Sequence, residues 1–169
     1  MNISRRASIA LLASSFVGFA LSPAYAADTT INVSLWDKGA TSMDMLGETK
    51  PMGMAMTDAD MTMATMGVTL DVAEVPFGEV TFQVTNDSDS MIHEMVLAPV
   101  TDVSVPLPYL TDLEKVDEDA AGHLGEVAEL EPGQSGALTM TLDPGSYILY
   151  CNIPGHYVMG MWTFLTVTG

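Results

Sequence analysis

Basic residues, cysteines and histidines are all scarce in this chain of 169 residues. Five lysines and arginines stand against 22 aspartates and glutamates, which gives a formal net charge of −17. Nucleic acids and anionic membrane surfaces both attract positively charged proteins, so this balance argues against either as a partner. The single cysteine, Cys151, excludes an internal disulfide and any site that requires two thiolates.

The chain also lacks long apolar runs. The longest apolar run that it does have lies near the N-terminus. Arg5 and Arg6 precede an apolar run over 9–21, and Ala24-Tyr25-Ala26 then matches the small-residue pattern that signal peptidase recognises. Neither this run nor a later one reaches the roughly 18 residues that a membrane span requires. The sequence therefore predicts a secretory signal peptide over residues 1–26 and a periplasmic protein, with a retained N-terminal anchor as the alternative.

Residues 27–169 are expected to form one β-rich domain. The chain is 48% hydrophobic and 16% charged, which supports a packed core. Short alternating runs are separated by turn sequences such as Asp143-Pro144-Gly145, a pattern typical of antiparallel sandwiches and barrels. A last strand is expected over 161–168. The residues that share one face of the other expected strands are Ile31, Val33 and Leu35; Val68, Leu70 and Val72; Val80, Phe82 and Val84; His93, Met95 and Leu97; Leu138, Met140 and Leu142; Tyr147, Leu149 and Cys151.

One acidic segment favours a helix instead. Thr111 and Glu114 have the spacing of a capping box, so we expect a short helix from about Thr111 to about Ala121. The acidic residues over 112–119 then form a solvated face. The negative field of such a face also attracts a basic partner, at a rate that falls as salt is added.

The segment 150–161 places three metal-binding side chains within eleven residues: Cys151, His156 and Met161. The segment lies between two expected strands, so a single loop can bring these side chains together. His93, on an earlier strand, can approach them across the sandwich. Two imidazoles, one thiolate and a weak thioether are the donors of trigonal copper sites that transfer electrons. Soft sulfur favours Cu(I) and imidazole serves both oxidation states, so little has to move when the electron does.

With these residues in place, the sequence resembles the cupredoxins, the small type 1 blue-copper proteins of the plastocyanin and azurin kind. The likeness covers nearly all of residues 27–169 and includes Tyr150-Cys151, Pro154-Gly155-His156 and Gly160-Met161. The spacing Cys-x4-His-x4-Met is similar to that of rusticyanin-type members. The resemblance implies an all-β, Greek-key β-sandwich that holds one type 1 copper. We expect this domain to contain the short helix as well, and a Met-rich insertion that the family pattern does not require.

The resemblance also implies a role for each ligand. His93, Cys151 and His156 correspond to the equatorial ligands and Met161 to the axial one, with Met159 as the alternative axial donor. Taken one at a time, each of these residues has an alternative as an ordinary core residue, because buried cysteine, histidine and methionine often serve only packing.

Two neighbours of the ligands are expected to tune the sulfur. The backbone amides of Glu94 and Asn152 occupy positions where the family donates hydrogen bonds to the thiolate. Glu94 departs from the family pattern, in which a smaller polar residue is common. A backbone amide survives that change, but the added charge alters the expected reduction potential.

The scarcity of histidine limits what else a copper protein of this kind can do. Multicopper oxidases and copper nitrite reductases need further histidine-rich sites, and a chain with three histidines cannot supply them. The single thiolate excludes a binuclear centre bridged by two thiolates, and His123 is expected on the surface. We therefore expect a protein that is not an enzyme.

Methionine, in contrast, is abundant, and eight of the fourteen methionines lie over residues 43–66. Thioethers bind Cu(I) without losing a proton, so this segment is a candidate secondary Cu(I) site. The alternative is a loop or edge strand in which methionine fills irregular gaps. The eight residues are Met43, Met45, Met52, Met54, Met56, Met61, Met63 and Met66.

Two functions follow from these observations. The first is an exported type 1 copper protein, expected to be a monomer, that exchanges single electrons with a basic redox protein such as a cytochrome or an oxidoreductase subunit. The second is a periplasmic copper-binding protein for copper tolerance, buffering or delivery, which uses the Met-rich segment and additional Cu(I).

Overall fold

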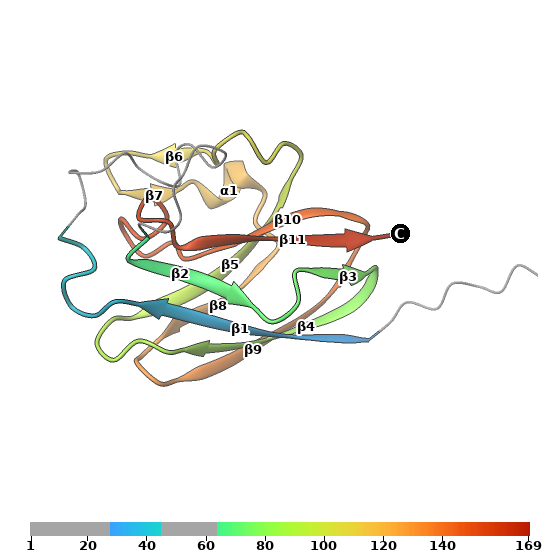
Figure 1. Cartoon of the computed structure of the whole chain (residues 1–169). Helices are drawn as coiled ribbons and strands as arrows, with labels where there is room; N and C mark the ends of the chain where they lie inside the picture. The colour runs from blue at the N-terminus through green and yellow to red at the C-terminus, as the bar shows by residue number, and fades with distance from the viewer. Residues whose placement is uncertain (1–27, 45–63) are drawn as a thin grey trace, which may run out of the picture.

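The computed structural model describes residues 28–44 and 64–169, most of whose strands form two sheets packed face to face, as Figure 1 shows. The predicted signal peptide and the methionines from Met45 to Met63 lie outside the described residues. The first sheet has the strand order β2-β1-β4-β9. Its strands are β1 (Thr29–Asp37), β2 (Met66–Leu70), β4 (Gly78–Asn86) and β9 (Ser135–Leu142).

The second sheet has five strands in the order β3-β11-β10-β5-β8. They are β3 (Glu74–Pro76), β5 (His93–Val100), β8 (Gly125–Leu130), β10 (Gly145–Tyr150) and β11 (Trp162–Thr168). The chain passes repeatedly from one sheet to the other, as Greek-key connections require. It alternates between the first and the second sheet at each step from β2 to β5, and it crosses to the first sheet at β9 and back to the second at β10. The predicted all-β sandwich is therefore confirmed.

Not every strand pair is antiparallel. β1 pairs with β4 in parallel, and β11 pairs with β3 in parallel, whereas the other pairs within the two sheets are antiparallel. Parallel neighbours need a crossover connection. For β1 and β4 that connection contains the long middle segment, β2 and β3.

Alternating side chains build the core between the sheets. In β1 and β4 the apolar alternation predicted from the sequence is fully buried, for example at Ile31 and Phe82, both 0% exposed. The six residues 93–98 of β5 are buried on both faces. One face of β5 packs into the core between the sheets, and the other contributes Val96 and Ala98 to a second cluster on the outside of the second sheet.

A small outer layer covers that second cluster. It contains the strand pair β6 (Tyr109–Leu110) and β7 (Lys115–Val116) and the helix α1 (Glu118–Ala121), seen together at the upper left of Figure 1. The predicted helix from Thr111 was therefore too long. Residues 111–114 form a turn, and α1 is capped instead by Asp117, whose side chain accepts the Ala120 N–H at 3.1 Å. No helix in the described part of the chain has the length and apolar character that a membrane crossing needs.

Candidate metal centre

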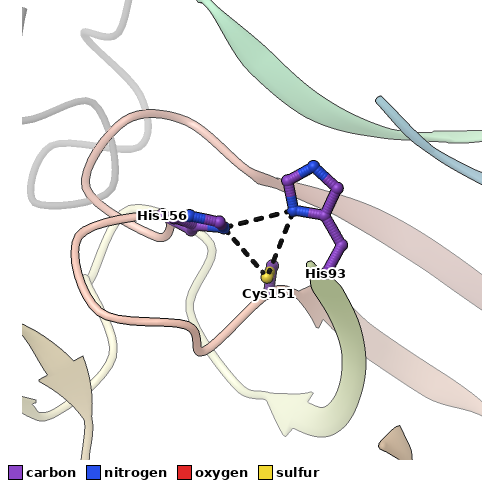
Figure 2. A group of neighbouring side chains, drawn as sticks. All are labelled: His93, Cys151 and His156. Atoms are coloured by element: carbon purple, nitrogen blue, oxygen red, sulfur yellow. Dashed lines mark hydrogen bonds between the residues drawn. The ribbon is translucent and has the colours of Figure 1, made fainter. Parts of the chain in front are cut away.

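Three donor atoms from two distant parts of the chain meet at one end of the sandwich. His93 begins β5, Cys151 directly follows β10, and His156 lies in the loop between β10 and β11. The two Nδ1 atoms are 3.2 Å apart, and Cys151 Sγ lies 3.3 Å from His156 Nδ1 and 4.0 Å from His93 Nδ1. Figure 2 shows all three atoms directed at the same point. The residues are 0–3% exposed, so the point is closed to bulk water.

The backbone of residues 151–161 holds two of the donors and closes on Met161. The Cys151 N–H donates to the Met161 carbonyl at 3.0 Å, and the Met161 N–H donates to the His156 carbonyl at 3.1 Å. Gly155 and Gly160 take φ of 82° and 96°, a left-handed region that favours glycine over any residue with a side chain. The tight loop therefore depends on the glycines of the Pro-Gly-His and Gly-Met motifs.

Met159 and Met161 are both buried, at 2% and 0% exposed, in the core cluster that contains Cys151. Burial therefore does not separate the predicted axial residue from its alternative. The backbone does distinguish them. The N–H groups of both methionines donate to the His156 carbonyl, but of the two only Met161 is also hydrogen-bonded to Cys151, whose N–H donates to its carbonyl.

His93 is fixed from its far side by Asp37, the last residue of β1. Asp37 Oδ2 lies 2.9 Å from His93 Nε2, and the two side chains are 1% and 0% exposed. Burial raises the pKa of Asp37, but hydrogen bonds from Ser88, His93 and the Gly39 backbone outweigh it, so the pKa lies below its usual value. Burial lowers the pKa of His93 more than Asp37 raises it. A neutral imidazole therefore faces an ionised carboxylate.

His156 is also neutral at physiological pH. Burial, together with the proximity of His93, lowers its pKa to about 4. Because both imidazoles are neutral, neither has to be deprotonated from the imidazolium form before it binds a metal ion.

The sulfur of Cys151 is completely buried and accepts backbone hydrogen bonds. The Glu94 N–H donates to Sγ at 3.5 Å, as predicted. The second amide on the sulfur belongs to Ile153, whereas Asn152 had been expected there. Burial raises the pKa of Cys151 to about 12 although both amides lower it, so the group is a thiol when no metal is present.

Asn152 has a different task. Its Oδ1 accepts the Val116 N–H at 2.7 Å, and its Nδ2 donates to the Val116 carbonyl at 3.1 Å and to Glu118 Oε1 at 2.6 Å. The residue next to Cys151 thus ties the metal-binding loop to β7 and α1. Sequence spacing placed Asn152 beside the ligand but could not show which way its side chain points.

The donor set fits a copper ion. Bonds of about 2.0 Å from a metal to imidazole nitrogen and about 2.3 Å to thiolate sulfur sum to more than each donor–donor distance, so one ion can reach all three atoms. Two imidazoles and one thiolate in a closed, mainly apolar site match the trigonal copper centres of electron-transfer proteins. A thioether at Met161 or Met159 completes that pattern.

Sequence reasoning missed two residues of this centre, Asp37 and Ser88. Asp37 ends a strand whose apolar residues alone marked it in the sequence, and Ser88 lies in the loop between β4 and β5, where its polar neighbours are typical of any turn. The contact between Asp37 and His93 spans 56 residues. No local spacing or repeat marks such a pair, so only the fold reveals it.

Two other polar groups lie outside the three-donor centre. Glu94 is 7% exposed, and its Oε1 has no hydrogen-bond partner among the described residues. His123 is exposed, as expected, and groups with Glu118 and Glu126 within 4.8 Å on the surface. The described methionines of the Met-rich segment are Met66, which is a core residue of β2, and Met43, which packs against the core.

Comparison with known families gives a match over residues 51–168 to the model of copper-binding proteins of the plastocyanin/azurin family. Among curated proteins, auracyanin-B of Chloroflexus aurantiacus is 45% identical over 51 residues, which are 30% of this chain and 22% of that protein. The match thus spans less than a quarter of the length of this relative.

Solved structures share the fold at low sequence identity. Reduced auracyanin from Roseiflexus castenholzii superposes with a TM-score of 0.52 at 19% identity, covering 86% of this chain and 100% of that one. Rusticyanin from Thiobacillus ferrooxidans gives a TM-score of 0.52 at 15% identity, covering 85% and 80%. At these identities the likeness concerns the fold alone.

Proposed function

Because the chain belongs to the plastocyanin/azurin family of copper-binding proteins, a cupredoxin family, we propose that it carries single electrons on one type 1 copper ion. His93, Cys151 and His156 are its equatorial ligands and Met161 its axial ligand. The observation that carries the proposal is the convergence of two Nδ1 atoms and one Sγ atom, 3.2–4.0 Å apart, at a closed point in the core.

When bound, copper supplies the one-electron change between Cu(II) and Cu(I). The residues around it keep the donor geometry constant. His93 is held by Asp37, His156 by the bonded turns of its loop, and Cys151 by the hairpin and by two amides on its sulfur. Donors fixed in this way move little between oxidation states, and a small rearrangement lowers the barrier to electron transfer.

The proton of Cys151 has to leave when copper binds. The thiol has a pKa of about 12 because it is buried, yet a coordinating sulfur is deprotonated by the metal. Both imidazoles are already neutral near pH 7. Loading with copper therefore releases about one proton per ion at neutral pH.

The partner of the protein is a basic redox protein. Support comes from the net charge of −17 and from the surface next to the His156 loop. The Gly155 N–H donates to the Glu114 carbonyl at 2.8 Å, so the turn over 111–114 lies against this loop. That turn exposes Leu113 and the acidic residue Asp112, which suits a partner with basic groups around an apolar patch.

We further propose that the chain is exported to the periplasm after removal of residues 1–26, and that it catalyses no substrate reaction. Arg5, Arg6, the apolar run and Ala24-Tyr25-Ala26 support export. Electrophoresis and N-terminal sequencing of the secreted protein test this: a chain beginning at Ala27 is expected, and a full-length chain retained in cells would contradict export.

The test of electron transfer is a redox titration of the copper-loaded protein, followed by its visible and paramagnetic resonance spectra. One copper per chain, an intense sulfur-to-Cu(II) charge-transfer band and reversible one-electron bleaching are expected. Copper that binds without a thiolate band, or that cannot be reduced and reoxidised reversibly, would contradict the proposal.

Copper handling is the second candidate function. Eight methionines within residues 43–66 favour it, because thioethers select Cu(I). The protein should then hold more than one Cu(I) under reducing conditions but only one Cu(II). Replacing the six methionines from Met45 to Met63 by leucine keeps hydrophobicity and approximate volume, so the visible band should remain while the extra Cu(I) is lost. Unchanged Cu(I) stoichiometry would leave only the electron carrier.

A further inference from the structure

Asp37 approaches the metal centre from a different part of the chain than any proposed ligand. It ends β1 in the first sheet, whereas the three donors come from β5 and from the β10–β11 loop of the second sheet. Its Oδ2 lies 2.9 Å from Nε2 of His93, the ring nitrogen that faces away from Cys151 and His156. The contact is shielded from water, since the side chains are 1% and 0% exposed.

The carboxylate of Asp37 is itself held in place. Its Oδ1 accepts the Gly39 N–H at 2.6 Å, and the Ser88 side chain also bonds to it. The Ser88 oxygen accepts N–H groups from Ser90 and Met91 at 3.1 and 2.9 Å, so its own hydrogen is the one directed at Asp37. Three donors, from the turn after β1, the β4–β5 loop and the start of β5, thus converge on one buried carboxylate.

This arrangement dictates where the proton of His93 resides. An ionised carboxylate can only accept hydrogen bonds, so Nε2 must donate and carries the ring proton. Nδ1 is then the unprotonated nitrogen, and it points at Cys151 and His156 (Figure 2). The tautomer with a lone pair on Nδ1 is the one that can bind a metal at this point.

The same carboxylate also changes the charge of the centre. A thiolate and two neutral imidazoles leave one net positive charge with Cu(II) and none with Cu(I). A buried carboxylate neutralises the first state and makes the second one negative, and burial limits screening by salt. A carboxylate on the outer nitrogen also makes a ligating imidazole more basic. Both effects favour Cu(II).

We propose that Asp37 is a positioning residue of the copper centre that fixes the Nε2–H tautomer of His93 and lowers the reduction potential by favouring Cu(II). This inference rests on the proposed function for its copper half. Its tautomer half concerns the protein alone and can be tested without metal.

The first test is nitrogen NMR of the metal-free protein. In the wild type, His93 should show a protonated Nε2 and an unprotonated Nδ1, with the Nε2 proton in slow exchange because it is buried. Asp37→Ala should give a mixture of tautomers. Asp71→Asn is the matched control, because Asp71 accepts two hydrogen bonds from Asn32 of β1 without contacting His93. A wild-type His93 protonated on Nδ1 would overturn the inference, and this measurement needs no variant to fold.

The second test is the midpoint potential of copper-loaded Asp37→Asn, which keeps the shape and an oxygen acceptor but removes the charge. Loss of such an outer partner typically costs about 10–100-fold in metal affinity. We expect Cu(II) to weaken at least about tenfold relative to Cu(I), which raises the potential by about 59 mV. A folded Asp37→Asn protein with the same potential as Asp71→Asn would overturn the counter-charge role.

The two tests separate the inference from the function on which it rests. If the wild type holds no redox-active copper, the proposed function and the counter-charge role both fail, while the NMR result still decides whether Asp37 positions His93. If copper cycles normally but the Asp37 variants behave like the Asp71→Asn control, the inference fails while the proposed function stands.

Discussion

His93 and Glu94 are neighbours on β5, yet the polar side-chain atoms of His93 have partners whereas a carboxyl oxygen of Glu94 has none among the described residues. Both are buried, at 0% and 7% exposed. Both ring nitrogens of His93 have polar partners, with Asp37 on one side and His156 on the other. Glu94 Oε1 has no partner among the described residues, although its backbone N–H bonds to Cys151.

The surroundings explain the difference. Strand alternation directs His93 toward the core between the sheets and Glu94 toward the outer layer of β7 and α1. There the pKa of Glu94 is raised to about 7, mainly because the carboxyl is buried. Lys115 opposes this shift, and the negative charges of Glu118 and Glu126 add to it. An unpaired buried carboxyl costs stability. The face of β5 that carries His93, the copper face, is thus held in a fixed geometry. The opposite face of the same strand, the outer face, carries an unfavourable charge.

Cys151→Ser gives the largest expected effect on the copper face. A serine hydroxyl cannot replace the thiolate, so the charge-transfer band should disappear while the circular dichroism spectrum of the β-sandwich stays the same. A visible spectrum of the copper-treated variant tests this. Colour retained at wild-type intensity would show that Cys151 is not the sulfur ligand.

Asn152→Ala should distinguish the stability of the outer layer from the geometry of the copper site, because Asn152 links the metal-binding loop to the outer layer. The variant loses the bonds to Val116 and Glu118 and leaves the buried Val116 N–H unpaired. We expect a loss of about 1–3 kcal/mol in unfolding free energy in urea. Because Asn152 does not bond the sulfur through its side chain, the visible band should keep its position. A shifted band would mean that the outer layer also sets ligand geometry.

Glu94→Gln should stabilise the outer face, with a pH dependence of known sign. The pKa of about 7 in the folded protein lies above the ordinary glutamate value of 4.5, so the contribution of Glu94 to stability is fully present below about pH 4.5 and is lost as pH rises through about 7. Because one group exchanges at most one proton, its contribution to the unfolding free energy cannot change by more than about 1.4 kcal/mol per pH unit.

Urea unfolding of the metal-free protein at pH 5 and pH 8 measures that dependence. The variant should exceed the wild type in stability at pH 8 and differ little at pH 5. Glu126→Gln, an exposed residue of the same outer face, is the control and should show a much smaller change. Equal pH profiles for wild type and Glu94→Gln would indicate that Glu94 finds a partner in solution.

The smallest expected effect concerns the axial thioether. Met161→Leu removes a weak donor, and loss of an axial donor disfavours Cu(II), so the potential should rise while copper is retained. Met159→Leu is the matched control, since it is buried in the same cluster. If the spectrum shifts in Met159→Leu and not in Met161→Leu, the axial ligand is Met159.

The parts predicted from sequence were those that local patterns encode. Alternation at Ile31, Val33 and Leu35 and at Val80, Phe82 and Val84 predicted β1 and β4, because one face of each strand is buried. β8 was missed since its burial pattern does not alternate, and the register between β5 and β8 shifts at His93 and Met95. The bulge there breaks the two-residue period.

The candidate centre divides in the same way. Cys151, His156 and Met161 lie close in sequence, so their convergence could be inferred from one loop. The side-chain direction of Asn152 and the contact between Asp37 and His93 depend on how distant strands pair. No spacing rule encodes a contact between the end of β1 and the start of β5, which requires the packed sandwich.

X-ray absorption spectroscopy at the copper edge, on wild type and Cys151→Ser side by side, identifies the atoms that bind the copper ion. We expect two imidazole nitrogens and one short copper–sulfur bond in the wild type, and loss of that sulfur scatterer in the variant. A wild-type copper ion surrounded only by nitrogen and oxygen, or a short sulfur bond that persists in Cys151→Ser, would contradict the assignment of His93, Cys151 and His156 as the copper site.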